Sequence, residues 1–481
     1  MGVRNEIRFL LNDEEIRLKN LSPDLSLLDY LRLNKDLVGT KEGCNEGDCG
    51  ACTVLVGKLV FGELIYESVN ACIRFVPSLD LCHIITIEHL KRNDVLHPIQ
   101  QAMVEYHGSQ CGFCTPGIIM SLYALLLKDP NANKHEIEKA LQGNLCRCTG
   151  YAPIIKAALS LSESGGLQND ILLKQREEIA QKLKDMSDGN RVEMSSEKGE
   201  FFIPKDIADL ILLLEQKSNA TILAGSSDIG LWVNVAHKDI SPIIFIANLS
   251  ELKNISQTKA GLEFGACVTY SESYEIIAKF FPHLSEFWAQ IGGNQIRNMG
   301  TLGGNIANGS PIGDLAPAFI ALGAKLNLVK GKTERTILLE DFYIAYAKQD
   351  LQKGEFIKSI FIPFIKENEK HAIYKISKRK YEDISTVCAA FKLEIGNKKI
   401  TKAIFAFGGM AAKPSRARET EKALEGKAFN EENIKKASIE LANDFAPIDD
   451  VRSSAQYRML LAQNLLYKFF MEQKYGQKNE R

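Results

Sequence analysis

The chain has 481 residues, of which 45% are hydrophobic and 25% are charged, and its formal net charge at pH 7 is −1. This length predicts about three domains, and the composition is typical of globular proteins that fold in water. A net charge so close to zero gives no indication of a nucleic-acid or membrane partner.

The N-terminal residues predict a small mixed domain. Two short alternating runs, 5–12 and 14–20, predict a hairpin of strands. A helix is expected over 25–33 and a strand over 52–60. Acidic residues interrupt the first apolar stretch, which is unlike a secretory signal, and no run of about 18 apolar residues occurs in the chain. We therefore expect a cytoplasmic protein without a membrane span.

The hydrophobic period changes from about Asp94, where a helical domain is expected. Apolar residues at helical spacing predict four amphipathic helices, at 95–107, 117–129, 134–143 and 151–162. Pro130 marks the break between the second and the third of them.

A polar and charged segment, 163–198, is expected to be a linker that runs over the surface and has room for a helix. Beyond it, strand-like runs at 221–230, 242–250 and 261–270 indicate mixed α/β structure. The tail from 371 adds further strands and then helices. The predicted segments are therefore 1–90, 91–162, 163–198 (the linker), 199–370 and 371–481.

Cysteine is concentrated near the N-terminus: nine of the eleven fall within the first 148 residues. In a reducing cytoplasm this concentration indicates metal binding rather than disulfides. The first group has the spacing C-x4-C-x2-C…C, which is typical of a plant-type 2Fe–2S site. Gly43, Gly47 and Gly50 let this loop fold closely around a cluster. A zinc site or free structural cysteines are the alternatives, although zinc more often takes repeated C-x2-C pairs. The candidate ligands of this first group are Cys44, Cys49, Cys52 and Cys72.

A second group consists of Cys111, Cys114, Cys146 and Cys148. Cys146 and Cys148 stand too close together for a relaxed disulfide, and four thiolates of this kind suit either zinc or an iron–sulfur cluster. Pro116 is well placed for the first turn of a helix, which puts Cys111 and Cys114 in the loop before that helix. The remaining cysteines are expected to be buried structural thiols: Cys82, Cys267 and Cys388.

Three stretches, 44–54, 110–117 and 143–151, together resemble the two-cluster iron–sulfur module of the molybdenum hydroxylases, the xanthine dehydrogenase family. The resemblance covers residues 1 to about 162. It implies a β-grasp ferredoxin domain and a four-helix domain, each with one 2Fe–2S cluster. It also implies that the helical-domain cluster lies nearer the molybdenum and the ferredoxin cluster nearer the flavin. Gln110 matches a glutamine near the molybdopterin, with an ordinary loop residue as the alternative.

The segment from about 199 resembles the family's FAD-binding region. Residues 221–230 resemble its first FAD motif, in which backbone N–H groups of a Gly/Ser turn would cradle the pyrophosphate. The turn is no Rossmann fingerprint, because no G-x-G-x-x-G opens a helix here. The cofactor contacts implied in this motif are Ile222, Leu223, Ala224, Gly225, Ser226, Ser227, Asp228 and Ile229.

Residues 291–324 resemble the second FAD motif along their whole length. By the same resemblance Ile357 packs on the adenine, Lys375 lies near the flavin, and the loop 382–384 lies beside the isoalloxazine ring. Residues 447–458 resemble the family's C-terminal flavoprotein signature. The further cofactor contacts implied are Ile291, Thr301, Gly304, Asn305, Asp314, Ile357, Lys375 and Ile384.

The predicted fold class is α+β and multidomain: a β-grasp 2Fe–2S ferredoxin domain, a four-helix 2Fe–2S domain and an α+β FAD-binding domain with a C-terminal flavoprotein subdomain. The order of these cofactors resembles the small subunit of bacterial members of the family, whose large partner subunit binds molybdopterin, commonly in a heterotetramer. The hypothesis is a relay of electrons from the partner, which hydroxylates a purine, through both clusters to FAD and then to NAD. No side chain of this chain is expected to act as acid or base on the purine. The alternatives are the same role for an aldehyde or N-heterocycle, a stand-alone iron–sulfur flavoprotein, and a structural zinc protein.

Overall fold

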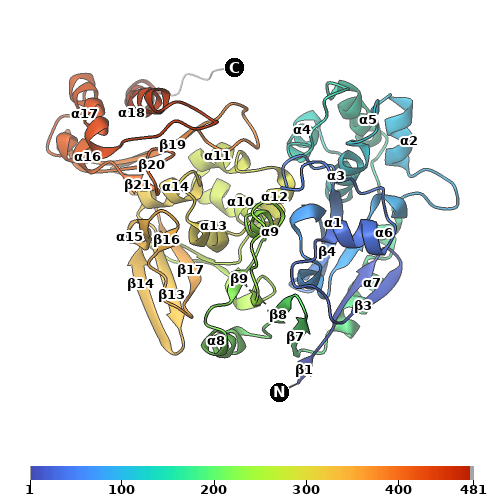
Figure 1. Cartoon of the computed structure of the whole chain (residues 1–481). Helices are drawn as coiled ribbons and strands as arrows, with labels where there is room; N and C mark the ends of the chain where they lie inside the picture. Colours follow the sequence, from blue (N-terminus) through green and yellow to red (C-terminus); the bar gives the residue numbers. More distant parts are fainter. Residues whose placement is uncertain (1, 477–481) are drawn as a thin grey trace. The chain divides into compact units, whose positions relative to one another are not determined.

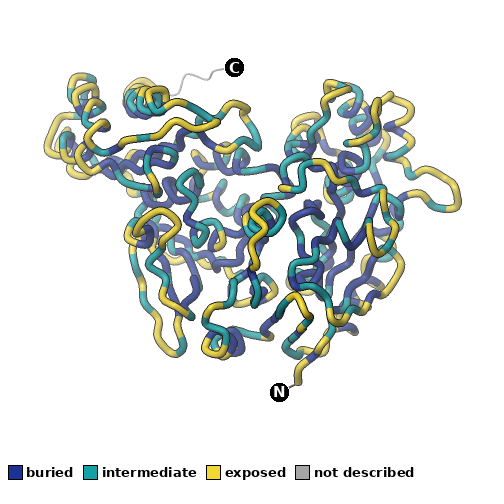
Figure 2. The backbone as a smooth tube through the Cα atoms, viewed as in Figure 1, coloured by how far each residue is buried: buried dark blue, intermediate teal, exposed yellow. Residues whose placement is uncertain are grey.

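A computed structural model describes residues 2–476. The chain forms two compact units, labelled by element in Figure 1. Unit 1 comprises Met1–Leu249 and Gly292–Gly300, and unit 2 comprises Ser250–Ile291 and Thr301–Arg481. In each unit the central strands and the inner helix faces are buried, whereas exposed residues gather on loops, outer strands and outer helix faces (Figure 2). In the part of the chain that the structure describes, no helix is both long and apolar enough to cross a membrane.

The N-terminal part of unit 1 is a mixed five-stranded sheet with the order β3-β2-β6-β4-β5. β2 and β3 form the predicted antiparallel hairpin, and β2 runs parallel to β6. Successive residues of β2 enter different cores, because side chains alternate across a strand: Phe9 faces one core cluster and Leu10 the other. This arrangement confirms the predicted β-grasp domain. Its elements are β2 (Ile7–Leu11), β3 (Glu14–Leu18), α1 (Leu27–Asp29), β4 (Thr53–Val60), β5 (Glu63–Asn70) and β6 (His83–Ile85).

The four predicted amphipathic helices follow the sheet. Capping boxes at His97 and Asn133 start the first and the third of them. Asp129 is extended before Pro130, as a residue before proline prefers, and the second helix ends there. This confirms the four-helix domain, which consists of α2 (Pro98–Glu105), α3 (Thr115–Lys128), α4 (Lys134–Ala140) and α5 (Ala152–Glu163).

The polar segment 163–198 contains α6 (Ile171–Lys174), α7 (Arg176–Met186) and β7 (Arg191–Ser196). Ile179 and Leu183 stand one helical turn apart on α7 and are buried in the core of the helical domain. The charged residues of α7 occupy the opposite, exposed face. The segment is polar in composition because only one stripe of a surface helix needs to be apolar.

A second five-stranded sheet of unit 1 has the order β1-β7-β8-β10-β9. Its residues Phe201 and Phe245 share a core with Phe9 of the ferredoxin sheet. The start of the predicted flavin half therefore packs with the iron–sulfur domains, while the domain limits at 90, 162, 198 and 370 stay predictions. Further elements of unit 1 are β1 (Val3–Arg4), β8 (Gly199–Ile203), α8 (Ile207–Gln216), β9 (Thr221–Leu223), α9 (Ile229–Asn234), β10 (Ile243–Phe245) and α12 (Asn294–Met299).

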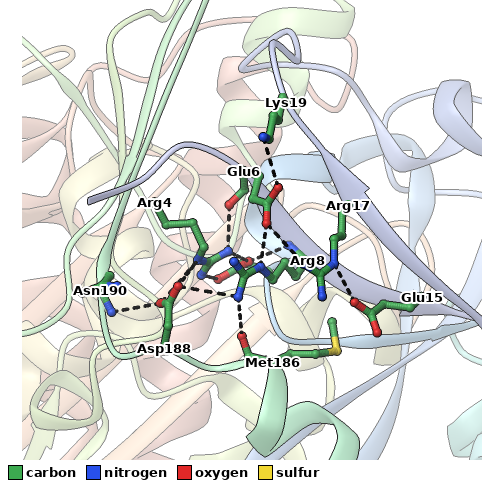
Figure 3. A network of polar contacts seen from close by, with 10 residues as sticks. Arg4, Glu6, Arg8, Glu15, Arg17, Lys19, Met186, Asp188 and Asn190 are labelled. Carbon is green, nitrogen blue, oxygen red and sulfur yellow. Dashed lines mark hydrogen bonds and ion pairs between the residues drawn. The ribbon is translucent and has the colours of Figure 1, made fainter. Parts of the chain in front are cut away.

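A buried ion pair joins the N-terminal strand to the ferredoxin core. The guanidinium of Arg4 donates to both carboxylate oxygens of Asp80, at 2.8 and 2.7 Å, and it also reaches Asp188. Figure 3 shows the surrounding network, in which Arg8 contacts Glu6 and Asp188. Because β1 also pairs with β7, this network attaches the chain start to two sheets.

Asp80→Asn is expected to destabilise the protein by about 3–5 kcal/mol, because it leaves the buried guanidinium of Arg4 without its bidentate partner. Glu15→Gln is the matched control, since its pair with Arg17 is largely exposed and contributes less than about 1 kcal/mol. Urea unfolding measures both variants. Equal losses of stability in the two variants would contradict the assignment.

Unit 2 contains the five-stranded sheet β11-β12-β17-β13-β14 and the four-stranded sheet β18-β19-β20-β21. Every residue of α14 (Leu315–Leu322) is buried, as expected for a helix that is apolar on all sides. In the second core, Phe391 stacks on Phe469 with ring centroids 5.4 Å apart. These sheets and helices confirm the predicted α+β fold of the flavin half.

The strands of unit 2 are β11 (Ile255–Gln257), β12 (Gly261–Gly265), β13 (Lys325–Lys330), β14 (Thr333–Leu338), β15 (Tyr343–Ala345), β16 (Lys348–Gln349), β17 (Phe356–Pro363), β18 (Glu369–Ile376), β19 (Val387–Gly396), β20 (Lys399–Gly408) and β21 (Ser415–Arg416). Its helices, besides α14, are α10 (Tyr270–Phe280), α11 (Ser285–Ala289), α13 (Leu302–Asn308), α15 (Leu339–Phe342), α16 (Arg418–Leu424), α17 (Glu431–Asp444) and α18 (Ala455–Tyr475).

Two histidines of unit 2 share one hydrogen bond: His283 Nε2 lies 2.8 Å from His371 Nδ1. Burial lowers the pKa of both imidazoles. The unfolded chain therefore takes up protons more readily than the folded chain below about pH 6.5. The stability contributed by the neutral pair is present above that pH and is lost as the pH falls.

We expect the free energy of unfolding to fall between pH 7.5 and pH 5.5 by about 1.4 kcal/mol in total for each histidine that ionises only on unfolding. His371→Gln should reduce this slope, because one buried imidazole is removed. Urea titrations at three pH values measure the slope. An unchanged slope in the variant would show that the pair does not control it.

Candidate functional site

The first cysteine set lies in unit 1, on the loop before β4 and in the turn after β5. Cys52 and Cys72 are buried, whereas Cys44 and Cys49 are partly exposed. The Sγ of Cys44 accepts backbone N–H groups of Glu46, Asp48 and Cys49, at 3.5, 3.3 and 3.3 Å. These donors favour a thiolate, which is the form that binds iron.

The four thiols of this set contact one another in pairs. Hydrogen bonds from the Cys49 and Cys72 thiols lower the pKa of Cys44, and a hydrogen bond from Cys72 lowers the pKa of Cys52. A Cβ at Gly43 would lie 2.6 Å from Cys49 Sγ, so only glycine leaves room for the sulfur there. The donor set and the cradle therefore fit a thiolate-bound cluster.

The second set gathers where α3 and α5 begin. Cys114 directly precedes α3, with Pro116 in the first turn as expected, and Cys146 and Cys148 lie in the loop before α5. Burial and the hydrogen bond that its thiol donates to Cys146 raise the pKa of Cys114 to about 12. The Thr149 hydroxyl lies 3.1 Å from Cys146 Sγ.

Cys148 completes the second set, because its thiol is hydrogen-bonded to that of Cys111, which raises the pKa of Cys148. Both of these cysteines are exposed. Among residues 2–476, no three His, Cys, Asp or Glu side chains are placed to hold a single metal ion. The three other cysteines, Cys82, Cys267 and Cys388, are buried outside both sets.

The two cysteine-bearing loops touch through their backbones. The N–H of Leu145 donates to the carbonyl of Cys49 at 2.9 Å. A Cβ at Gly50 would lie 1.9 Å from the carbonyl oxygen of Gly143, and a Cβ at Gly117 would lie 2.1 Å from that of Gly50. Glycines thus allow a close approach between the two iron–sulfur domains, which the spacing of cysteines alone does not predict.

The first flavin motif forms the turn between β9 and α9 in unit 1. Ser226 has φ +55°, and its buried hydroxyl has no hydrogen-bond partner in the described structure. A Cβ at Gly225 would lie 2.1 Å from the carbonyl oxygen of Met299, so the turn needs glycine to pack on the end of α12. A buried, unpartnered hydroxyl in a small-residue turn fits a phosphate-bearing ligand.

The other predicted flavin residues lie in unit 2. Thr301 caps α13 by accepting the N–H of Gly304 at 3.1 Å. Asp314 and Lys375 come together as a buried pair at 2.8 Å, and Lys375 also donates to the carbonyl of Gln290. Burial differs among the apolar members: Ile291 and Ile357 are core residues, while Ile384 is about half exposed.

Sequence reasoning missed Ser385, which donates its hydroxyl to Asp314 Oδ1. Ser385 directly follows the loop 382–384, which the sequence had already indicated as part of the flavin site, so its place in the sequence could have identified it. In that loop Glu382 has φ +70° and Asp383 accepts Arg379. The Asp314 carboxylate therefore accepts hydrogen bonds from Lys375 and Ser385, which are 61 and 71 residues away along the chain.

Models of four protein families match the chain in order. They are a 2Fe-2S iron-sulfur cluster binding domain at 9–73, a [2Fe-2S] binding domain at 86–159, the FAD binding domain in molybdopterin dehydrogenase at 194–365 and the CO dehydrogenase flavoprotein C-terminal domain at 372–473. These matches and the geometry define an iron–sulfur flavoprotein with two 2Fe–2S domains and an FAD-binding domain.

Similar proteins specify the family. Xanthine dehydrogenase/oxidase of Rattus norvegicus is 31% identical over 97% of this chain and 39% of its own length, and xanthine dehydrogenase of Dictyostelium discoideum is 30% identical over 97% and 40%. A crystal structure of Cu,Mo-CO dehydrogenase superposes with a TM-score of 0.52 at 28% identity, over 56% of this chain and 94% of that one. The chain belongs to the molybdenum hydroxylase family of oxidoreductases and carries its 2Fe–2S and FAD part. It spans about two fifths of the length of the curated relatives named here.

Proposed function

We propose that this chain is the electron-transfer part of a molybdenum-dependent xanthine dehydrogenase. A molybdopterin-binding partner subunit oxidises hypoxanthine to xanthine and then urate, and the electrons reach NAD through this chain. The observation that carries the proposal is the direct hydrogen bond between the two cysteine loops, Leu145 N–H to Cys49 carbonyl, on a chain with both flavin motifs. A relay needs its carriers in adjoining segments, and these loops adjoin.

Each set of residues has a defined role in this proposal. Cys44, Cys49, Cys52 and Cys72 hold one 2Fe–2S cluster, and Cys111, Cys114, Cys146 and Cys148 hold the other. When bound, the clusters would carry single electrons and FAD would collect two of them for transfer to NAD, which joins a one-electron relay to a two-electron acceptor. The turn 222–229 binds the pyrophosphate through its N–H groups, and Thr301, Gly304, Asn305 and Asp314 bind the rest of FAD. Ile291, Ile357, Lys375 and Ile384 line the flavin and adenine.

The exposure of Cys111 and Cys148 supports the order of the relay. These two are the exposed cysteines, whereas Cys52 and Cys72 are buried. The helical-domain cluster therefore has the more accessible thiols, which suits exchange of electrons with a second subunit. Gln110, directly before Cys111, is also exposed and is assigned to the same contact with the molybdopterin subunit.

A second candidate is the same role for a different substrate. A crystal structure of quinoline 2-oxidoreductase from Pseudomonas putida 86 superposes with a TM-score of 0.50 at 25% identity. The substrate would contact the partner subunit rather than this chain. The contacts described for this chain are therefore equally compatible with an N-heterocycle, an aldehyde or a purine.

Purification of the native protein with its associated subunits tests the proposal. We expect about four iron per chain, one FAD, a larger molybdenum-containing partner in a heterotetramer, and NAD reduction that depends on xanthine. Reduction with quinoline or an aldehyde, but not with xanthine, supports the second candidate. NADH-dependent reduction without any molybdenum partner indicates a stand-alone iron–sulfur flavoprotein and overturns both.

A further inference from the structure

Helix α12 belongs to the iron–sulfur unit although it lies inside the second flavin motif. Residues 292–300 group with unit 1, whereas the flanking residues Ile291 and Thr301 belong to unit 2. Asn298 donates to the carbonyl of Ser68 at 2.9 Å, and Arg297 donates to Gln142 at 2.9 Å. The helix is thus attached to β5 of the ferredoxin domain and to the loop of the helical domain that precedes Cys146.

Gln295 is the most buried polar residue of this helix, with 1% of its surface exposed. Its side-chain amide nitrogen lies within hydrogen-bond distance of Thr53 Oγ1 (3.0 Å), Ser121 Oγ (3.1 Å) and Asn144 Oδ1 (3.0 Å). Two N–H groups therefore serve three acceptors. Each acceptor comes from a different segment of unit 1.

All three segments carry cluster cysteines. Thr53 directly follows Cys52, Asn144 precedes Cys146 by two residues, and Ser121 lies on α3, the helix that Cys114 precedes. Gln295 therefore connects the ferredoxin loop to both halves of the second cysteine set.

The acceptors also hold the contact between the loops. Asn144 Nδ2 donates to the Gly50 carbonyl at 3.1 Å, and Thr53 Oγ1 donates to the same carbonyl at 2.6 Å. Next to these contacts, the Leu145 N–H donates to the Cys49 carbonyl. The amide of Gln295 thus orients the two side chains that hold the loops at this distance.

The position of Gln295 is maintained at a cost in free energy. Its Oε1 is buried without a hydrogen-bond partner in the described structure, and such an unsatisfied acceptor costs about 1–3 kcal/mol. A Cβ at Gly143 would lie 1.8 Å from this oxygen, so the loop provides a glycine to admit it.

We propose that Gln295 is a positioning residue that sets the alignment of the two cysteine loops and thereby the rate at which an electron passes between the two clusters. The inference rests on the proposed function, because it requires that both sets hold 2Fe–2S clusters. In each transfer the cluster held by one set would lose one electron and the cluster held by the other set would gain it, and no bond would form or break. Through α12, part of the flavin motif sequence thus controls a contact within the iron–sulfur unit.

The test replaces Gln295 with Met in the purified holoprotein, because Met keeps the length of the side chain and removes its donors. We expect iron to stay at about four per chain, while the rate of electron equilibration between the clusters after photoreduction falls about 10- to 100-fold. The magnetic splitting in the EPR spectrum of the fully reduced protein should change as well. Gln181→Met on the exposed face of α7 is the control and should change neither quantity.

The outcomes separate the two proposals. A wild-type protein without iron overturns the proposed function. A wild-type protein with both clusters, combined with an unchanged rate and splitting in Gln295→Met, overturns the role of Gln295 alone. Loss of iron from Gln295→Met also overturns it, since cluster retention rather than alignment would then be affected. If Gln295→Met does not fold, Ser121→Ala removes one acceptor and must show a slower rate; a wild-type rate there overturns the role.

Discussion

Cys72→Ala is expected to lower the iron content of the purified protein from about four to about two per chain and to abolish one of its two EPR signals. Cys72 is buried in the turn after β5, and its thiol is hydrogen-bonded to those of Cys44 and Cys52. Removing one of four ligands leaves the other thiolates without a complete site, so the cluster is lost rather than weakened. Because binding of the cluster also stabilises the fold, the melting temperature should fall too.

The matched control is Cys82→Ala. Cys82 is a buried cysteine of the same domain, and its Sγ donates to the Asp80 carbonyl at 3.7 Å. This variant should retain about four iron per chain. Iron contents that fall equally in both variants would mean that Cys72 is not a ligand.

Gly50→Ala is expected to destabilise unit 1 strongly, for two separate reasons. Gly50 has φ +68°, where a Cβ costs about 1–2 kcal/mol. The added Cβ would also lie 1.9 Å from the Gly143 carbonyl oxygen, which is backbone and cannot rotate away. Forcing the loops apart adds about 1–3 kcal/mol, and it breaks the contact between the two cysteine loops.

Gly62→Ala separates the two causes. Gly62 has φ +89° in the turn between β4 and β5, and nothing lies within 4 Å of an added Cβ. This variant therefore reports backbone strain alone. Urea unfolding of the two variants measures the difference, which we assign to the loop contact. A Gly50→Ala variant no less stable than Gly62→Ala would refute the close approach.

Local patterns were sufficient for most of the secondary structure and for the grouping of the cysteines. The hairpin at Ile7–Leu18 and the four helices between Pro98 and Glu163 follow from alternation, helical spacing and caps. Helix α7 in the polar segment was harder to predict, because its buried stripe is narrow.

The sequence by itself predicted which thiols group, which turns resemble FAD motifs, and the order of the domains along the chain. These properties depend on residue types and on spacings of a few residues. Only the tertiary structure showed that α12 joins the iron–sulfur unit and that Gly50 serves the contact with Gly143. Gln295 and Thr53 are 242 residues apart in the sequence. Contacts over such separations depend on how buried surfaces fit together, and local periodicity carries no information about that fit.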